Sequence, residues 1–387
     1  MENLTVGVFY RDALRPGGVP TQTLQLCSAL NEIVNHVVLH AYMDSEETFD
    51  PSRFTFRVNP HIHRGVTGIS DPWRLPSSLR DSICHNADNL DVLLLIGSFI
   101  PENAPVGRVA VASGLPYVVS VQDAFTPVLW SGRRGVKKSL YHLAVEKRLI
   151  EKAAGLRIYS DEVRHHLSLR GHRCNGRCFV AKEGIDLDKD ESKKPHRLST
   201  LKGSAPRFGF LGRLDIFQKG LDILVQAWRR HVASGGRGSL DLVGPASVAE
   251  TRMLRRLIGS GVDRLNVRGP LYGSEKFKYL RSLDYFVHPS RHEGIPRAVL
   301  EALGVGIPVI ITPGTNLHDI VAQDCVGYVV DLHPKSIETV FKQADKDQWD
   351  DTAQLARFER ARSDLSWRSV AEDLAQGLTG SVRLSGR

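Results

Sequence analysis

The feature that most constrains this chain is a regular alternation of apolar, strand-like runs with amphipathic helical stretches. In the first half, the apolar runs predict strands at residues 4–10, 37–42, 91–96, 117–121 and 156–159, with helices at 19–32, 108–112 and 137–153. In the second half, they predict strands at residues 207–211, 239–243, 265–268, 285–288, 308–311 and 327–330. Such alternation is typical of parallel sheets, because parallel strands need crossover connections. We therefore predict an α/β fold.

The alternation is interrupted once, and this divides the chain. Residues 188–204 are rich in Lys, Asp, Ser and Pro, as expected of a solvated connection. We predict one doubly wound domain over residues 1–187, a linker over 188–204 and a second domain over 205–365, with a helix at 366–387 that packs back on the first. A chain of 387 residues is long enough for two such cores. Ligands of doubly wound sheets bind at the carboxyl ends of the strands, so we expect the site in an interdomain cleft.

Composition excludes several classes of protein. With 42% apolar and 24% charged residues, the chain is neither disordered nor fibrous. The longest apolar run, residues 92–100, is about half the length that a membrane span needs. The N-terminus has no basic segment ahead of its apolar run, so no signal peptide is predicted. We therefore expect a cytoplasmic protein whose five cysteines are free thiols.

Positive charge is concentrated in one segment. The net charge is +8, whereas residues 130–182 alone hold thirteen Lys and Arg against four acids, or +9. Near its start, Arg133, Arg134, Lys137 and Lys138 are interleaved with apolar positions at 136, 140, 143 and 144. Two interpretations stay open: a helix in peripheral contact with an anionic membrane at the inner surface, or a core-packed helix with a basic outer face. A phosphorylated acceptor would suit the same charge.

A cluster of glycine and cations follows the first predicted strand of the second domain. Gly212 allows close approach of the backbone to a ligand, while Arg213 and Lys219 place two positive charges near the start of the next helix. This arrangement suits a diphosphate leaving group, because negative charge grows on its bridging oxygen as the bond to the sugar breaks.

Two carboxylates follow a later strand of the same domain. Glu293 lies in the loop after the strand at 285–288, and Glu301 lies eight residues on, in a helix that begins near Pro296. Carboxylates staggered in this way can each accept hydrogen bonds from hydroxyl groups at different parts of one elongated ligand. Alone, the pair could equally be surface acids on a helix. Together with Arg213 and Lys219, it indicates a binding site.

These motifs resemble family 4 of the glycosyltransferases. The Glu-x7-Glu hallmark of that family is matched by Glu293-Gly-Ile-Pro and Glu301-Ala, and its Gly-Arg-Leu…Lys-Gly hallmark by residues 212–214 and 219–220. A Gly-Gly-Val turn after the first strand is matched at 17–19. The resemblance extends over nearly the whole chain. It implies the GT-B fold, with two facing Rossmann-like domains, and a retaining hexosyltransferase that uses a nucleotide diphosphate sugar.

The resemblance also implies roles for individual residues. Arg213, Lys219 and Glu293 are expected to be catalytic, the two cations on the diphosphate and Glu293 on the donor sugar. The nucleotide sugar should be bound further by Glu301, on the ribose hydroxyls, and by Gly18, Leu271, Gly294 and Ile295. The donor would be UDP- or GDP-linked and is a substrate, so no cofactor or metal is expected. The acceptor would be a sugar, a lipid-linked compound or a small molecule. The reaction would belong to cell-envelope, exopolysaccharide or glycolipid synthesis.

One position departs from the family pattern. Relatives often carry a His-Asp pair where this chain has Gln122-Asp123. Gln122 can orient substrates through hydrogen bonds but cannot serve as a general base near neutral pH. In a retaining front-face mechanism the departing phosphate oxygen can take the proton of the acceptor. The alternative is a non-catalytic protein of the same fold that binds sugar nucleotides.

Other readings are weaker. The Asp-x-Asp pattern at 186–190 better fits a solvated turn than a metal site, and the cysteines at 174 and 178 have no second pair at a zinc-like distance. A pI of about 9.3 suggests a nucleic-acid-binding protein as another hypothesis, but no binding motif or stacking series of aromatics accompanies the charge.

Overall fold

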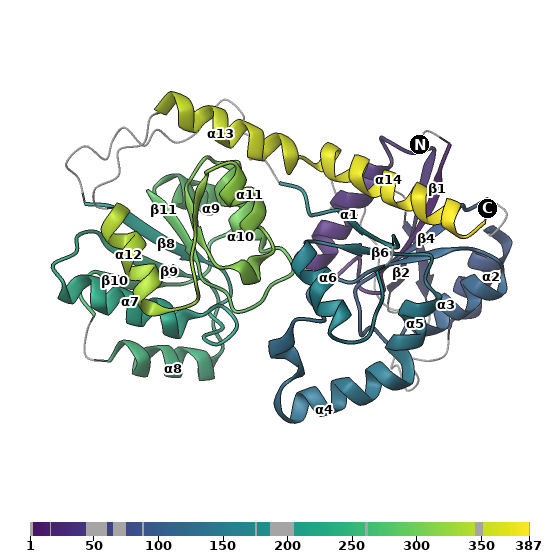
Figure 1. Ribbon diagram of the computed structural model, residues 1–387, viewed down its shortest axis with the longest axis horizontal. Helices are drawn as coiled ribbons and strands as arrows, with labels where there is room; N and C mark the ends of the chain where they lie inside the picture. Colours follow the sequence, from purple (N-terminus) through teal and green to yellow (C-terminus); the bar gives the residue numbers. More distant parts are fainter. Residues whose placement is uncertain are drawn as a thin grey trace. The chain divides into compact units, whose positions relative to one another are not determined.

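The chain forms two compact units in a computed structural model that describes residues 3–15, 17–43, 60–64, 75–86, 89–174, 176–185, 205–259, 262–344 and 351–386. Contacts between residues divide it into an N-terminal unit, residues 1–184 with 367–387, and a C-terminal unit, residues 185–366 (Figure 1). The predicted linker at 188–204 and the Asp-x-Asp pattern lie outside the described residues.

The N-terminal unit is built on a parallel sheet of seven strands in the order β3-β2-β1-β4-β5-β6-β7. Its strands are β1 (Thr5–Phe9), β2 (His36–Met43), β3 (Pro60–Arg64), β4 (Val92–Ile96), β5 (Tyr117–Ser120), β6 (Gly155–Ile158) and β7 (Cys178–Val180). The five predicted strands are confirmed. The sequence did not predict β3, which is mostly polar, or β7, which has three residues. Both lie at edges of the sheet, where a long apolar run is not required.

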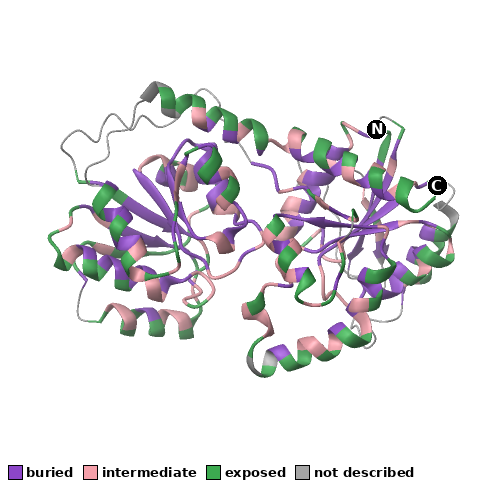
Figure 2. Cartoon of the chain, in the orientation of Figure 1, coloured by how far each residue is buried: buried purple, intermediate pink, exposed green. Residues whose placement is uncertain are grey.

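Helices cover both faces of this sheet. They are α1 (Gly18–Leu30), α2 (Ser77–Asn86), α3 (Asn103–Ala112), α4 (Gly132–Tyr141), α5 (Lys147–Lys152), α6 (Asp161–Ser168) and α14 (Trp367–Leu384). One buried cluster includes side chains of α2, α3, α5 and α6, and the other includes those of α1 and α14. Figure 2 shows the strands between these helices as almost wholly buried. The unit is therefore doubly wound.

The C-terminal unit has a parallel sheet of six strands in the order β10-β9-β8-β11-β12-β13. Its strands are β8 (Arg207–Leu211), β9 (Ser239–Val243), β10 (Leu265–Arg268), β11 (Tyr285–His288), β12 (Val309–Ile311) and β13 (Gly327–Val329). The helices are α7 (Leu221–Ala233), α8 (Val248–Ile258), α9 (Gly273–Arg281), α10 (Arg297–Gly304), α11 (His318–Gln323), α12 (Pro334–Ala344) and α13 (Asp351–Asp364). All six strands were predicted, and the α/β fold is confirmed.

The basic helix does not pack its apolar positions into a core, as the core-packed interpretation requires. Residues 132–152 form α4, a π-helical turn at His142–Glu146 and α5. Val136, Leu140 and Leu143 are 62–67% exposed, so this part of the helix does not bury its apolar positions in a core. Lys138 is turned inward instead: its ammonium donates to the carbonyl of Ala124 and lies 4.5 Å from the ring centre of Phe99. Its ammonium is therefore partnered within the protein, whereas Arg133 and Lys137 are exposed on α4.

Two of the five cysteines are paired, so the prediction of five free thiols is wrong. Cys174 and Cys178 form a disulfide. The chain turns tightly here, with the backbone N–H of Cys178 donating to the carbonyl of Cys174, and this brings their Cα atoms to 5.1 Å, within the usual range for a disulfide. Cys27, Cys84 and Cys325 are free. Among the described residues no cluster of His, Cys, Asp and Glu could hold a metal ion, and none of their helices could cross a membrane.

The C-terminal helix α14 is part of the N-terminal unit. Its side chains Val370, Leu374 and Leu378 are buried against α1 and the sheet. A Cβ added to Gly377 of this helix would lie only 2.1 Å from the ring of Phe179 in β7. The helix thus completes one face of a sheet whose strands all precede it in sequence.

We predict that Leu374→Ala lowers the free energy of unfolding by about 2–5 kcal/mol, the usual cost of removing a fully buried leucine side chain. Leu384→Ala, at a 64% exposed position of the same helix, is the matched control and should cost less than ~0.5 kcal/mol. Denaturant titration of both variants measures the difference. Equal stability of the two variants would contradict the packing of α14.

Candidate active site in the C-terminal unit

The candidate site lies where the strand order of the C-terminal sheet reverses. Neighbouring strands β8 and β11 mark this point, because the chain winds outward from them in opposite directions. Loops that follow such strands form the ligand-binding edge of a doubly wound sheet. Residues 212–220 follow β8 and residues 289–296 follow β11, so they bring Arg213, Lys219 and Glu293 to the same edge.

An arginine that sequence reasoning missed holds these two loops together. The guanidinium of Arg291 donates to both carboxylate oxygens of Asp222 at 2.7 Å and to the carbonyl of Phe217 at 2.6 Å. The backbone N–H of Arg291 also donates to the carbonyl of Gln218 at 2.8 Å. Bidentate pairs of this kind fix orientation as well as distance. Asp222 and Arg291 are 69 residues apart, and no local spacing pattern links them.

Gly220 makes the close approach of the two loops possible. It precedes α7 with φ of +64°, in the left-handed region that side chains disfavour. A Cβ built at this position would lie 2.1 Å from the carbonyl oxygen of Pro289, in the loop after β11. Any other residue here would have to push the loops apart.

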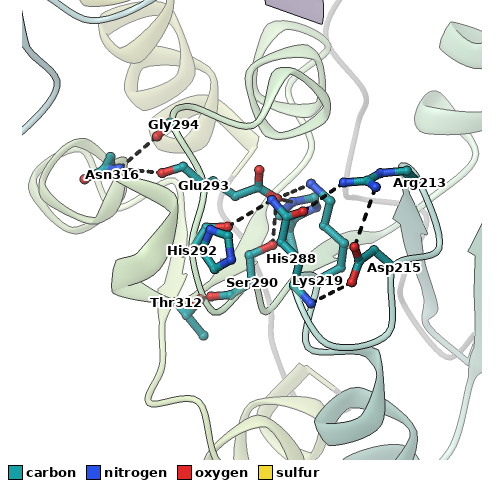
Figure 3. Close-up of polar contacts among 11 residues, drawn as sticks. Arg213, Asp215, Lys219, His288, Ser290, His292, Glu293, Gly294, Thr312 and Asn316 are labelled. Carbon is teal, nitrogen blue, oxygen red and sulfur yellow. Dashed lines mark hydrogen bonds and ion pairs between the residues drawn. The ribbon is translucent and has the colours of Figure 1, made fainter. Parts of the chain in front are cut away.

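Three donors converge on one oxygen of Glu293 (Figure 3). The Lys219 ammonium forms an ion pair with Oε1, the Ser290 hydroxyl donates to it at 2.9 Å, and His288 Nε2 lies 3.3 Å away. The side chains of Lys219 and Glu293 are only 12% and 10% exposed. A buried carboxylate in such a setting is held in one orientation before any ligand arrives.

This environment keeps Glu293 ionised. Burial raises its pKa, but the hydrogen bond from His288 and the charge of Lys219 outweigh burial and bring the pKa down to about 2. Burial lowers the pKa of His288, opposed by its hydrogen bond to Glu293. At neutral pH the site therefore presents a carboxylate that can accept hydrogen bonds from ligand hydroxyls.

The backbone around Glu293 is fixed by an asparagine that the sequence did not single out. Asn316 donates through Nδ2 to the carbonyls of Glu293 and Gly294, both at 2.8 Å. Thr312 donates to the carbonyl of Ser290 at 2.6 Å. Gly294 thus has its carbonyl occupied, and the following Ile295 is buried. These contacts make the Glu293 turn rigid.

Arg213 stands beside this buried pair but is open to solvent. Its side chain is 58% exposed, donates to Gln218 Oε1 at 2.9 Å and lies 3.6 Å from Asp215. The backbone N–H of Lys219 donates to the carbonyl of Asp215 at 3.0 Å, which folds residues 213–219 into one turn. The two predicted cations are therefore carried by the same turn, one exposed and one buried. Such a pair can bind an extended anion.

Glu301 has its own set of partners. It lies in α10, is almost fully buried, and accepts from Lys276 at 2.7 Å and from Arg297 at 3.1 Å. Sequence reasoning missed both cations, although the i,i+4 spacing of Arg297 and Glu301 on a helix is a recognisable signal. Leu271 lies in the loop between β10 and α9 and is partly exposed.

Two predicted residues belong to the N-terminal unit. Gly18 opens α1, is exposed, and has open space where a Cβ would lie. Gln122 follows β5 with φ of +55°, and Phe99, after the neighbouring strand β4, has φ of +60°. Residues other than glycine adopt this conformation rarely, and such strain is concentrated at functional sites.

Comparisons with known proteins bear on the C-terminal unit most directly. Residues 205–344 match the family of glycosyl transferases group 1. A GDP-mannose-dependent alpha-mannosyltransferase of Mycolicibacterium smegmatis is 33% identical over 85 residues, 20% of this chain and 23% of the relative. The capsular polysaccharide biosynthesis glycosyltransferase CapM of Staphylococcus aureus is 24% identical over 160 residues, 40% of each chain. The chain spans between about a quarter and a half of the curated relatives it matches.

Similarity of structure extends over the whole chain. HepE of Anabaena, solved in complex with UDP and glucose, has a TM-score of 0.69 at 14% identity, over 97% of this chain and 100% of that chain. Sucrose-phosphate synthase of Thermosynechococcus elongatus has a TM-score of 0.69 at 18% identity, over 97% and 98% of the two chains. At these identities the likeness concerns the fold, and it confirms the predicted GT-B type.

We predict that Gly220→Ala destabilises the protein by more than a left-handed backbone alone explains. The control is Gly235→Ala, at φ of +79° with no atom within 4 Å of the added Cβ, which should cost about 1–2 kcal/mol. Gly220→Ala adds the clash with Pro289 and should cost at least ~1 kcal/mol more. Thermal and denaturant unfolding of both variants tests this. Equal costs would show that the two loops can separate freely.

The lowered pKa of Glu293 predicts how stability depends on pH. Because the pKa in the folded protein is about 2 and the ordinary value is 4.5, ionised Glu293 stabilises the fold above pH ~4.5, and this contribution is lost as pH falls toward 2. The difference in unfolding free energy between the parent and Glu293→Gln should therefore be largest at pH 5 and above, at roughly 3 kcal/mol, and shrink toward pH 2. Glu275→Gln, at an exposed position of α9, is the control for removing a carboxylate elsewhere in the same unit. A pH-independent difference for Glu293→Gln would contradict the ionised state.

Proposed function

Because residues 205–344 match the family of glycosyl transferases group 1, we propose that the chain transfers a hexosyl group from a nucleotide diphosphate sugar to an acceptor, with retention of anomeric configuration. The donor would be linked to UDP or GDP. This agrees with the named donor of the mannosyltransferase relative and with the UDP bound to HepE. The relation to CapM favours a role in cell-envelope or exopolysaccharide synthesis.

The observation that carries this proposal is the ion pair of Lys219 and Glu293 at the switch point of the C-terminal sheet. A nucleotide diphosphate sugar combines an anionic diphosphate with a hydroxyl-rich sugar. Glu293, ionised and buried, would accept hydrogen bonds from the donor sugar, while Lys219 and the exposed Arg213 would bind the diphosphate. One ligand would thus engage both members of a pair that is already oriented.

The same residues account for the chemistry. Negative charge grows on the diphosphate as its bond to the sugar breaks, and fixed cations near that oxygen lower the barrier. Arg213 and Lys219 supply this charge, so the proposed mechanism requires no metal. The departing phosphate oxygen takes the proton of the acceptor hydroxyl, which attacks from the same face. We assign Gln122 to orienting the acceptor and donor through hydrogen bonds.

We assign binding of the nucleoside to the second carboxylate, Glu301. Glu301 would accept from the ribose hydroxyls, with Lys276 and Arg297 as positioning residues that hold its side chain. Leu271, Gly294 and Ile295 would contact the rest of the nucleotide sugar, and the backbone of Gly18 would bind the diphosphate.

One observation favours a second function, in which the protein binds sugar nucleotides without turnover. The resemblance to family 4 leads to the expectation of a histidine where this chain has Gln122. Both functions predict donor binding, and release of nucleoside diphosphate separates them.

A further partner is an anionic membrane surface. Arg133 and Lys137 are exposed on α4, beside the exposed side chains of Val136 and Leu140. A helix of this composition suits the interface of a bilayer that contains anionic lipids.

We predict that Arg213→Ala and Lys219→Ala each lower turnover by roughly a hundredfold or more, the scale for removing a group that stabilises developing charge. The measurement is release of nucleoside diphosphate from UDP-glucose and GDP-mannose, with thermal shift as a separate test of binding. Lys278→Ala, an exposed lysine of α9 in the same unit, is the control and should keep parental turnover.

Two results would count against the proposed reaction. Near-parental turnover of Lys219→Ala would show that the diphosphate lies elsewhere. Binding of a donor by the parent protein without any release of nucleoside diphosphate, over a panel of sugar and lipid acceptors, would favour the non-catalytic alternative.

A further inference from the structure

The helical segment of residues 132–152 carries exposed apolar side chains in its first half and exposed cations in its last half. Positions 136 and 140 lie one turn apart in α4, and positions 148 and 152 lie one turn apart in α5, with the π-helical turn at His142–Glu146 between the two pairs. The first two are Val136 and Leu140, which are 62% and 65% exposed, and Leu143 beside them is 67% exposed. The last two, Arg148 and Lys152, are exposed cations. An apolar half thus leads directly into a cationic half.

The cationic half lines a groove between α3 and α5. The groove has a volume of about 230 Å³, and its charged lining residues are Arg108, Arg148 and Lys152. No carboxylate lines it, and its remaining walls are apolar apart from Tyr117. The two helices meet closely at Gly107, where an added Cβ would lie 2.7 Å from Leu149. Figure 1 shows α3 and α5 on the same side of the N-terminal sheet, with α4 leading into α5.

The surrounding charge favours an anionic ligand. Residues 132–152 hold seven Lys and Arg and two Glu. Glu146 is fully buried and Glu151 lies 3.8 Å from Lys147, and neither carboxylate lines the groove. The exposed Val111 of α3, another lining residue, adds apolar surface at the rim.

We propose that the groove between α3 and α5 binds the phosphate headgroup of an anionic phospholipid in a bilayer, with Arg108, Arg148 and Lys152 on the phosphate. Val136, Leu140 and Leu143 then insert among the acyl chains beside it. This inference deepens the membrane contact proposed above and does not depend on the transfer reaction. The membrane contact is thereby assigned to one defined lipid site, in place of a general attraction between the basic helix and an anionic surface.

Other occupants fit these features less well. A second copy of this chain would bring the same cations into the same place, and three exposed apolar side chains are far short of the roughly 800 Å² per partner of a stable interface. A soluble phosphorylated compound would leave the apolar half of the segment in water. A lipid bilayer satisfies both halves at once.

The experiment is cosedimentation of the full chain with vesicles of phosphatidylcholine alone or mixed with an equal part of phosphatidylglycerol. We expect the parent to bind only the mixed vesicles. The double variant Arg148→Gln/Lys152→Gln should lower the partition coefficient by at least about tenfold, as should Leu140→Gln/Leu143→Gln. The matched control is Arg255→Gln/Arg256→Gln, which removes two exposed cations of α8 and should change binding by less than about twofold.

Each alternative gives a different result. Equal loss in the Arg148/Lys152 and Arg255/Arg256 variants would overturn the lipid site in favour of diffuse attraction, and no binding by the parent would overturn the membrane contact altogether. Inorganic phosphate that displaces the protein from vesicles at millimolar concentration would indicate a soluble anion instead. Dimerisation of the parent that Leu140→Gln/Leu143→Gln abolishes would indicate self-association. Release of nucleoside diphosphate without vesicles should be the same in all variants, so failure of the proposed reaction appears separately.

Discussion

The ion pair between Lys219 and Glu293 joins the two loops from which the candidate site is made, and the neighbouring contacts serve to hold it. Arg291 ties the loop of Lys219 to the loop of Glu293, Gly220 permits their close approach, and Asn316 holds the backbone carbonyls of Glu293 and Gly294. A buried ion pair loses much of its attraction to the cost of removing both charges from water. The pair also holds both charged groups in a fixed orientation at the ligand-binding edge of the sheet.

Both carboxylates of the candidate site are buried, and each is paired with one or more cations. Glu293 has Lys219, and Glu301 has Lys276 and Arg297. Two buried negative charges without such partners would repel an anionic ligand as well as destabilise the fold. With them, the carboxylates can still accept hydrogen bonds from hydroxyl groups, and Arg213 adds an exposed positive charge on the same turn as Lys219.

The sequence allowed prediction of the features that depend on local pattern. Buried parallel strands are apolar throughout, so β4, β5 and β8 were visible as apolar runs, and the spacing of Arg213, Lys219, Glu293 and Glu301 was visible as a motif. What escaped prediction depends on contacts between distant residues or on turn geometry. The Arg291–Asp222 pair joins positions 69 apart, the edge strand β3 alternates histidines with other residues, and the Cys174–Cys178 disulfide follows from a tight turn.

The return of α14 to the N-terminal unit has a consequence for synthesis of the chain. The N-terminal unit is discontinuous in sequence, because residues 185–366 form the other unit between its two parts. As the ribosome extends the chain, the C-terminal unit has all its residues once position 366 has emerged, whereas the earlier unit still lacks the helix that covers Leu24, Leu30 and one face of its sheet. The part made first is therefore finished last. In the interval it exposes an apolar sheet face, the kind of surface that chaperones bind.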